Sequence, residues 1–217
     1  MWTGGRKAAY PFFMTEKFLD RTYSLATPED TKQHYDHWAA SYDSEIAENG
    51  YATPARVAEA VWQFCPDPQA EVLDFGCGTG LSGLALRSVG YQWVDGMDPS
   101  DQMLEGARTK NAYRSLTAIR MQDRAPIPRN KYKVITGTGV LGVGAAPPET
   151  FDMIMHALPK GGLFAFSYND HALAERAYTG KITEWVDCAA GRLLFKDYGE
   201  HLPGLNLKSE VYVIEKA

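Results

Sequence analysis

Three glycines at alternate positions follow an acidic residue in the stretch from Val72 to Gly80, and no other stretch of the sequence points as clearly to a ligand-binding site. It reads Val-Leu-Asp-Phe-Gly-Cys-Gly-Thr-Gly, so an apolar run containing Asp74 leads directly into Gly76, Gly78 and Gly80. Glycine costs conformational entropy on folding, and three so close together indicate a sharp turn or the close approach of a ligand to the backbone. We therefore expect a buried strand that ends in a loop on which a ligand lies.

A second acidic residue, Asp98, ends the next expected strand, 20 residues after Gly78. In an open parallel sheet, ligands bind beyond the carboxyl ends of the strands, and an acid at this place can accept hydrogen bonds from both hydroxyls of a ribose. Two classes of ligand use this arrangement, namely dinucleotides such as NAD, and S-adenosylmethionine.

The order of the acid and the glycines favours S-adenosylmethionine over NAD. The segment Gly78 to Gly83 fits the dinucleotide pattern G-x-G-x-x-G, which is a weak signal when taken alone. In that pattern the first glycine follows the strand directly, whereas here Gly76 and Cys77 intervene and Asp74 lies within the strand. An acid two residues before alternating glycines suits a cofactor with a positive amino group and a sulfonium. An NAD-dependent oxidoreductase and a non-catalytic cofactor-binding module remain alternatives.

The elements that must position these residues alternate between strand and helix at intervals of roughly 20 to 30 residues, which is typical of parallel βαβ units. Strands are expected at 71–75, 92–97, 116–121, 133–136, 163–167, 192–195 and 210–214. Helices are expected at 81–89, 101–108, 147–158 and 172–190. The sequence thus predicts an α/β fold, a Rossmann-like doubly wound, seven-stranded, mostly parallel sheet with helices on both faces, in a single domain over 27–217.

Two further helices are expected before the first strand. Thr27-Pro28 begins one, with Tyr35, Trp38 and Tyr42 on a single aromatic face that serves either as a lid over the cofactor or as packing on the sheet. Thr53-Pro54 caps the other. Its expected apolar stripe is Val57, Ala60, Val61 and Phe64.

Several motifs point together to one known family. They are the stretch 72–80, Gly96-Met97-Asp98-Pro99-Ser100 followed by Met103-Leu104, and the segment 158–162. With these motifs the chain resembles the class I S-adenosylmethionine-dependent methyltransferases from Thr27 to Lys216. The leader Tyr-Asp-His-Trp-Ala-Ala-Ser-Tyr-Asp at 35–43 is similar to that of the ubiquinone-biosynthesis-like branch and of the Williams–Beuren-region methyltransferase-like group, and 140–142 with 147–149 is similar to the latter group.

The resemblance implies S-adenosylmethionine as cofactor, with S-adenosylhomocysteine as product, and it implies roles for particular residues. The methionine moiety is expected over the loop residues Gly76, Cys77, Gly78 and Gly80. Asp74 is expected to help hold its amino group, and Gly137 and Thr138 to line the same end. Tyr35, Trp38 and Tyr42 are candidates for contact with the cofactor.

At the adenosine end, the resemblance implies that Asp98, followed by Pro99, takes the ribose hydroxyls and that Met103 packs near the adenine. The places that usually hold an acid and an apolar residue at the adenine carry Arg120 and Met121. Arginine cannot accept a hydrogen bond from the adenine amino group, so either Asp123 substitutes or the backbone alone reads the adenine.

The implied reaction is an in-line methyl transfer to a small-molecule acceptor, and the sequence assigns no catalytic residue. Asn169, Asp170 and His171 follow the fifth strand, where they either take part in catalysis or cap the following helix. His201 is expected in a loop without a functional role. Ala146 and Glu149 flank Pro147-Pro148, so the Asn/Asp-Pro-Pro-aromatic motif of amino-methylating enzymes is absent.

Composition and charge argue against several other classes of protein. The 217 residues carry a formal charge of −5, which argues against a nucleic-acid partner, and no apolar stretch reaches the roughly 20 residues of a membrane span. The three cysteines, Cys65, Cys77 and Cys188, indicate neither a disulfide framework nor a zinc site, and we expect a cytoplasmic protein. Residues 1–26 are expected to form a partly disordered extension, of which 1–13 contribute nothing to function.

Overall fold

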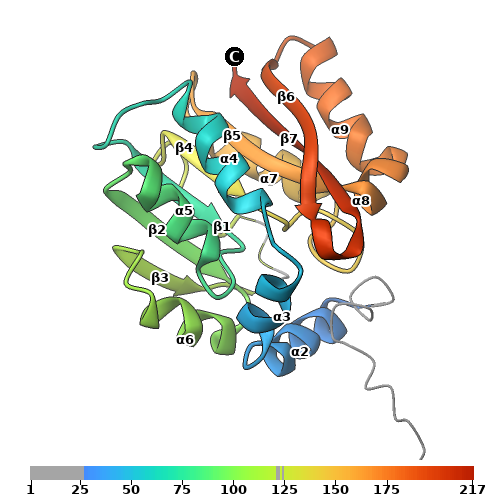
Figure 1. Cartoon of the computed structure of the whole chain (residues 1–217). Helices are drawn as coiled ribbons and strands as arrows, with labels where there is room; N and C mark the ends of the chain where they lie inside the picture. The colour runs from blue at the N-terminus through green and yellow to red at the C-terminus, as the bar shows by residue number, and fades with distance from the viewer. Residues whose placement is uncertain (1–26, 121–122, 124) are drawn as a thin grey trace, which may run out of the picture.

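The computed structural model describes residues 27–120, 123 and 125–217, and the expectations for residues 1–26 and for Met121 lie outside the described residues. A seven-stranded sheet with the strand order β3-β2-β1-β4-β5-β7-β6 runs through the molecule, and helices cover both of its faces (Figure 1). This arrangement confirms the predicted doubly wound α/β fold. The order reverses between β1 and β4, so the crevice of a doubly wound sheet is expected beyond the ends of these two strands.

The described elements follow one another along the chain in the expected alternation. The strands are β1 (Glu71–Phe75), β2 (Trp93–Asp98), β3 (Ser115–Ala118), β4 (Val134–Gly137), β5 (Leu163–Asn169), β6 (Gly191–Leu202) and β7 (Leu207–Lys216). The helices are α2 (Pro28–Trp38), α3 (Tyr42–Glu48), α4 (Thr53–Trp62), α5 (Leu81–Val89), α6 (Asp101–Thr109), α7 (Glu149–Ala157), α8 (Asp170–Ala174) and α9 (Arg176–Asp187), with a short 3₁₀ turn η2 (Pro203–Leu205). The predicted bounds of β1 and α5 are confirmed.

The central strands are buried on both faces, and most of their residues are apolar. On β1, Val72 packs with α4 and α5, whereas Leu73 packs with α7 on the opposite face. Phe151 of α7 packs edge-on against the rings of Phe164 and Phe166 of β5, with centroids 5.6 and 5.5 Å away. The two apolar clusters hold the parallel strands in register, so that their carboxyl ends lie at one edge of the sheet.

The last two strands run antiparallel to the rest of the sheet. β7 inserts between β5 and β6, and it pairs antiparallel with both. This return brings the end of β6 against the beginning of α4, where the Ala52 amide donates a hydrogen bond of 3.0 Å to the carbonyl of His201. His201 therefore lies at the end of a strand, and the expectation that it lies in a loop is wrong.

The N-terminal helices α2 and α3 lie together below the sheet in Figure 1. The Thr27 side chain accepts a hydrogen bond from the Asp30 amide, while Asp30 accepts one from the Thr27 amide, so α2 begins with a capping box. The expectation of one aromatic helix face is wrong for Tyr42, because α2 ends at Trp38 and Tyr42 opens α3. Even so, the Trp38 and Tyr42 rings remain in contact, with centroids 4.7 Å apart.

Other differences from the expected elements have local causes. Thr53 does not cap α4 but lies in its first turn, fully buried, because its hydroxyl bonds to residues of β6 and β7. Phe64 follows the end of α4 and is 40% exposed, so it leaves the apolar stripe. The helix expected over 172–190 divides into α8 and α9 where Glu175 adopts an extended conformation. Strand β3 ends at Ala118, before Arg120.

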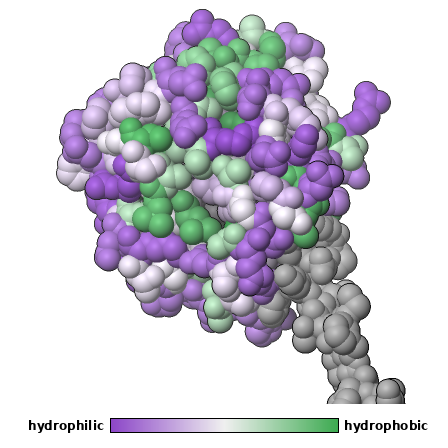
Figure 2. Space-filling model, in the orientation of Figure 1, coloured by the Kyte–Doolittle hydropathy of each residue, from purple (hydrophilic) through white to green (hydrophobic). Residues whose placement is uncertain are grey.

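Most of the surface on the side of α4 and α5 is hydrophilic, and a small group of apolar residues lies over α5 (Figure 2). Leu84 of this helix is 43% exposed. Within the described residues, none of the helices is both long enough and apolar enough to cross a membrane.

Candidate functional site

A cavity of about 380 Å³ lies beyond the carboxyl ends of β1, β2 and β4, at the point where the strand order reverses. It is closed on one side by α2 and the beginning of α3. Predicted site residues that line it are Tyr35, Tyr42, Gly76, Gly78, Asp98, Pro99, Met103, Arg120 and Thr138. The fold thus brings together residues separated by up to about a hundred positions in the chain.

The alternating glycines serve different purposes. Gly76 has a φ of +69°, and a Cβ there would overlap the Val140 side chain, with Cγ1 only 2.8 Å away. Gly78 has a φ of +51°, but a Cβ there would meet no atom within 4 Å. Gly78 lines the cavity, so this open space belongs to the cavity. Gly76 is therefore required for packing, and Gly78 leaves bare backbone for a ligand.

Asp98 connects the end of β2 to the glycine loop. One carboxylate oxygen accepts the Gly78 amide at 2.8 Å, and the other accepts the Ser100 amide at 2.9 Å. Asp98 is only 7% exposed, and this burial raises the pKa of its carboxyl group to about 6, although the two amides act in the opposite direction. The carboxylate is therefore fixed in position at the cavity wall before a ligand arrives.

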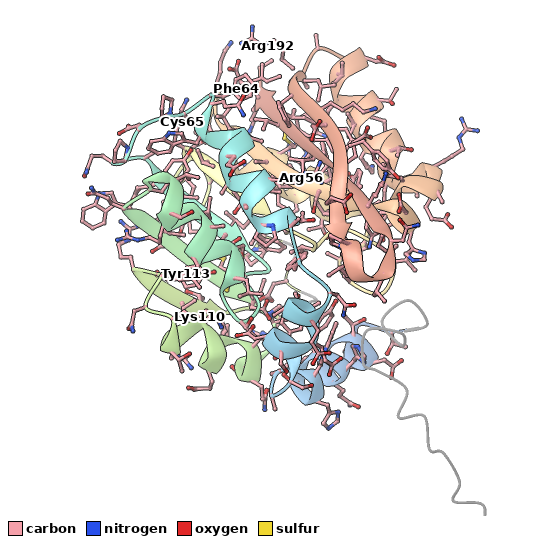
Figure 3. The ribbon with its side chains drawn as sticks, in the orientation of Figure 1. Arg56, Phe64, Cys65, Lys110, Tyr113 and Arg192 are labelled. Carbon is pink, nitrogen blue, oxygen red and sulfur yellow. The ribbon has the colours of Figure 1, made fainter. Side chains whose placement is uncertain are left out.

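Asp74 lies within the sheet and is fully buried. Its carboxylate accepts hydrogen bonds from the hydroxyls of Ser82 at 2.5 Å, Tyr113 at 2.7 Å and Thr136 at 3.0 Å. Burial raises its pKa, while these three hydroxyls act to lower it. Tyr113 approaches from the segment that precedes β3 (Figure 3), and its oxygen also accepts the Gly83 amide at 3.0 Å. Asp74 thus holds the segments around the glycine loop together from within the sheet.

Two polar connections hold α2 and α3 against the glycine loop and α6. Asp36 of α2 accepts the hydroxyl of Ser100, the residue that caps α6, at 2.5 Å. Asp43 of α3 accepts the Thr79 hydroxyl at 2.5 Å and forms an ion pair of 2.6 Å with Lys110. Lys110 lies at the end of α6 (Figure 3) and also donates to the Thr79 carbonyl at 2.7 Å. These contacts close the cavity on the side of the N-terminal helices.

The opposite end of the cavity is formed by residues that follow β3. Ile119, Arg120 and Asp123 line it, together with the side chain of Met103 from α6. The Asp123 carboxylate accepts the Arg120 amide at 3.3 Å and lies 3.8 Å from its guanidinium. An acid is thus present beside the position where the sequence carries arginine.

Not every predicted site residue reaches the cavity surface. Among the described candidates, Trp38, Asp74, Cys77, Gly80 and Gly137 do not line the larger cavity. Trp38 is 2% exposed and packs with Ile46 and Leu202, although it lines a smaller cavity next to the first. His171 is exposed and lines neither of these two cavities, and Asn169 caps α8 by accepting the Ala172 amide at 3.0 Å.

Some residues of the site carry no signal that single-sequence reasoning could detect. Tyr113 and Ser82 surround Asp74 from two different segments, and nothing in their spacing relates them to it. Gly139 and Val140 line the cavity from the loop after β4. For these two residues the sequence does carry a signal, because residues 137–144 contain four glycines and directly follow the strand expected at 133–136.

Comparisons with known proteins agree with this geometry. The family model described as "Methyltransferase domain" matches residues 46–202. Methyltransferase-like protein 27 from Homo sapiens is 33% identical over 132 residues, which are 59% of this chain and 54% of the human protein. The chain thus spans about half the length of this curated relative.

Solved structures show the same fold at low sequence identity. The cyclase SpnF superposes with a TM-score of 0.64 at 15% identity, covering 88% of this chain and 97% of that one. A SAM-dependent methyltransferase from Thermotoga maritima gives a TM-score of 0.59 at 14% identity, covering 86% and 99%. The match over 46–202 spans the glycine loop, Asp98 and the sheet from β1 to β6. The chain therefore belongs to the methyltransferase-domain family, whose methyl donor is S-adenosylmethionine, and it has the class I, Rossmann-like fold of that family.

Proposed function

We propose that this chain transfers the methyl group of S-adenosylmethionine to a small-molecule acceptor, and that the larger cavity binds the cofactor. Family membership and the position of the cavity at the reversal of strand order support this proposal. The likeness to SpnF, a cyclase, shows that the fold is compatible with another reaction. The proposal therefore depends on the residues of the site.

The observation that carries the proposal is the remaining capacity of the Asp98 carboxylate to accept hydrogen bonds. Each of its oxygens accepts one backbone amide, and an ionised carboxylate offers about four lone-pair positions. Capacity for two more donors remains at the wall of the cavity. Two neighbouring hydroxyls of a ribose are donors of the required number and spacing, so Asp98 fits the cofactor's ribose.

The rest of the cavity also fits the cofactor. The bare backbone at Gly78 admits a close approach, which suits the methionine moiety. Met103 is apolar and 2% exposed, and it provides a packing surface for the adenine. Asp123 is the acid that can accept a hydrogen bond from the adenine amino group. Cys77 and Gly80 shape the loop without reaching the cavity surface.

When bound, the cofactor supplies an electrophilic methyl group on a sulfonium. The protein's contribution is to position both reactants, which can lower the barrier by up to roughly 7–11 kcal/mol in favourable cases. Tyr35 and Tyr42 close the cavity and exclude water, since α2 and α3 are held by Asp36 and Asp43. Loss of these two carboxylates is expected to leave the cofactor more exposed to solvent.

A small acceptor is favoured by the charge and shape of the site. The chain carries a net charge of −5, and the two cavities lie between the sheet and the N-terminal helices. A polymer backbone such as RNA calls for a basic face. The NAD alternative loses support because the chain belongs to the methyltransferase-domain family.

Titration calorimetry with S-adenosylhomocysteine tests cofactor binding. We expect binding by the wild type and weaker binding by Asp98→Ala, whereas the absence of both heat and a thermal shift would overturn the proposal. Tritium-labelled S-adenosylmethionine, incubated with the protein and a cell extract, tests the acceptor. Label in the low-molecular-mass fraction supports a small acceptor, label only in RNA or protein contradicts it, and tight binding without any transfer identifies a non-catalytic module.

A further inference from the structure

A second cavity of about 60 Å³ adjoins the first, and its chemistry differs from that of the cofactor site. Tyr35, Tyr42, Gly139 and Ala145 line both cavities, so these residues form the boundary between them. A cavity needs roughly 10–15 Å³ to hold one water molecule, so the smaller cavity has room for a group of several atoms. Its other ring side chains are Trp38, Tyr51 and His201, its other polar residues are Ser167 and Asn169, and the remaining lining residues are aliphatic or glycine.

The lining of the smaller cavity is aromatic and uncharged. It contains four large aromatic rings and no aspartate, glutamate, lysine or arginine among the described residues. Burying a charged group without a partner is costly, whereas a planar neutral group can stack on such rings. The occupant that fits is therefore a neutral aromatic group.

His201 is the polar side chain whose orientation can be deduced. It is 6% exposed, its Nδ1 lies 2.7 Å from the Thr53 hydroxyl, and its ring packs edge-on against Tyr51. Burial is the largest cause that lowers the pKa of His201, to about 4. Arg56 and His171 act in the same direction and Asp170 opposes them. The imidazole is thus neutral at physiological pH, with one nitrogen protonated.

A chain of hydrogen bonds determines which nitrogen carries that proton. Arg56 can only donate, and its Nη1 donates to the Ser209 hydroxyl oxygen at 3.0 Å. Among the described partners of Ser209, only the Thr53 hydroxyl, 3.1 Å away, can accept the Ser209 proton. Thr53 must then donate its own proton to Nδ1 of His201. Figure 3 shows Arg56 on α4.

We propose that the smaller cavity binds the reacting end of a neutral aromatic methyl acceptor, and that His201 donates a hydrogen bond from Nε2 to an oxygen of that acceptor. Because Thr53 occupies Nδ1 as a donor, the proton of the neutral ring lies on Nε2. Tyr51 lies at the boundary between the two cavities, since a Cβ on the boundary residue Gly139 would lie 2.5 Å from the Tyr51 hydroxyl. This inference rests on the proposed function, because the acceptor is defined relative to the cofactor.

The test uses two probes of nearly the same shape, acetophenone and α-methylstyrene, in which a carbonyl oxygen is replaced by a methylene. Affinities are measured on protein saturated with S-adenosylhomocysteine, for the wild type and for His201→Phe. We expect the preference for acetophenone over α-methylstyrene to fall by about tenfold in the variant, as for one lost hydrogen bond. Benzoate is expected to bind more weakly than acetophenone. His156→Phe, on the exposed face of α7, is the matched control.

An unchanged preference in His201→Phe, or no binding of either probe, overturns the inference. ¹⁵N chemical shifts of the imidazole provide a second test on the wild type, which does not depend on the folding of a variant. A proton on Nδ1 contradicts the proposed chain of donors. Failure of S-adenosylhomocysteine to bind would instead refute the proposed function, so the two failures are distinguishable.

Discussion

One methyl group added at Gly76 should affect mainly folding, whereas the same group added at Gly78 should affect mainly ligand binding, although a single residue separates the two positions. At Gly78 the Cβ meets no atom within 4 Å, so the cost to folding is the left-handed backbone alone, about 1–2 kcal/mol. At Gly76 the same backbone cost is increased by overlap with Val140, which adds about 1–3 kcal/mol. We expect Gly76→Ala to lose about 2–5 kcal/mol of unfolding free energy.

For ligand binding the order is reversed. The Cβ of Gly78→Ala projects into the cavity and keeps other carbon atoms about 3.5–4.0 Å away, so a cofactor that lies on the bare backbone must move outward. We expect the dissociation constant of S-adenosylhomocysteine to rise at least about tenfold. A displacement of about 1 Å can cost roughly a hundredfold in rate, so turnover should fall further.

Urea unfolding and calorimetry with S-adenosylhomocysteine measure the two effects separately. The slope of the unfolding free energy against urea should stay the same, and only the midpoint should move. Wild-type affinity in Gly78→Ala would refute the reasoning, because the space above this glycine would then not belong to the cofactor. Equal stability of the two variants would contradict the distinction between packing and ligand approach.

Four further predictions concern polar groups of the site. Asp98→Asn should weaken S-adenosylhomocysteine about a hundredfold, since two hydrogen bonds to a charged acceptor are lost, and calorimetry measures this loss. Because the pKa of Asp98 is about 6 and the ionised form accepts the ribose hydroxyls, wild-type affinity should fall roughly tenfold between about pH 7 and pH 5, and a flat profile would contradict this assignment. Tyr113→Phe should lower the unfolding free energy by about 2 kcal/mol in urea titrations, because the buried Asp74 loses a hydroxyl donor; an unchanged midpoint would be the opposing result. Asp43→Asn should speed the release of S-adenosylhomocysteine in stopped-flow measurements more than it alters stability, since the ion pair with Lys110 is lost from the helices over the cavity, and an unchanged release rate would show that they do not retain the cofactor.

The sequence determined the central part of the fold and the position of the cofactor loop. Apolar runs with glycine at their ends depend on local backbone chemistry, so β1 and α5 could be assigned to the residue. The number of residues between Gly78 and Asp98 likewise follows from one βαβ unit, because the unit contains one short helix and one short strand after the glycine loop. The family resemblance drew on this segment together with other motifs, among them 96–100 and the leader at 35–43.

Only the tertiary structure decided what the long-range contacts do. Tyr42 belongs to α3 and not to α2, because the backbone turns after Trp38. This turn lets Ile46 of α3 pack with Trp38 and Leu202. His201 contacts the Thr53 hydroxyl because β7 inserts between β5 and β6 and brings Thr53, Ser209 and Arg56 together. These residues are up to 156 positions apart, and sequence periodicity carries no information on such pairs. Burial and hydrogen-bond contacts arise only when the chain has folded, and they shape the cavity in which we place the acceptor.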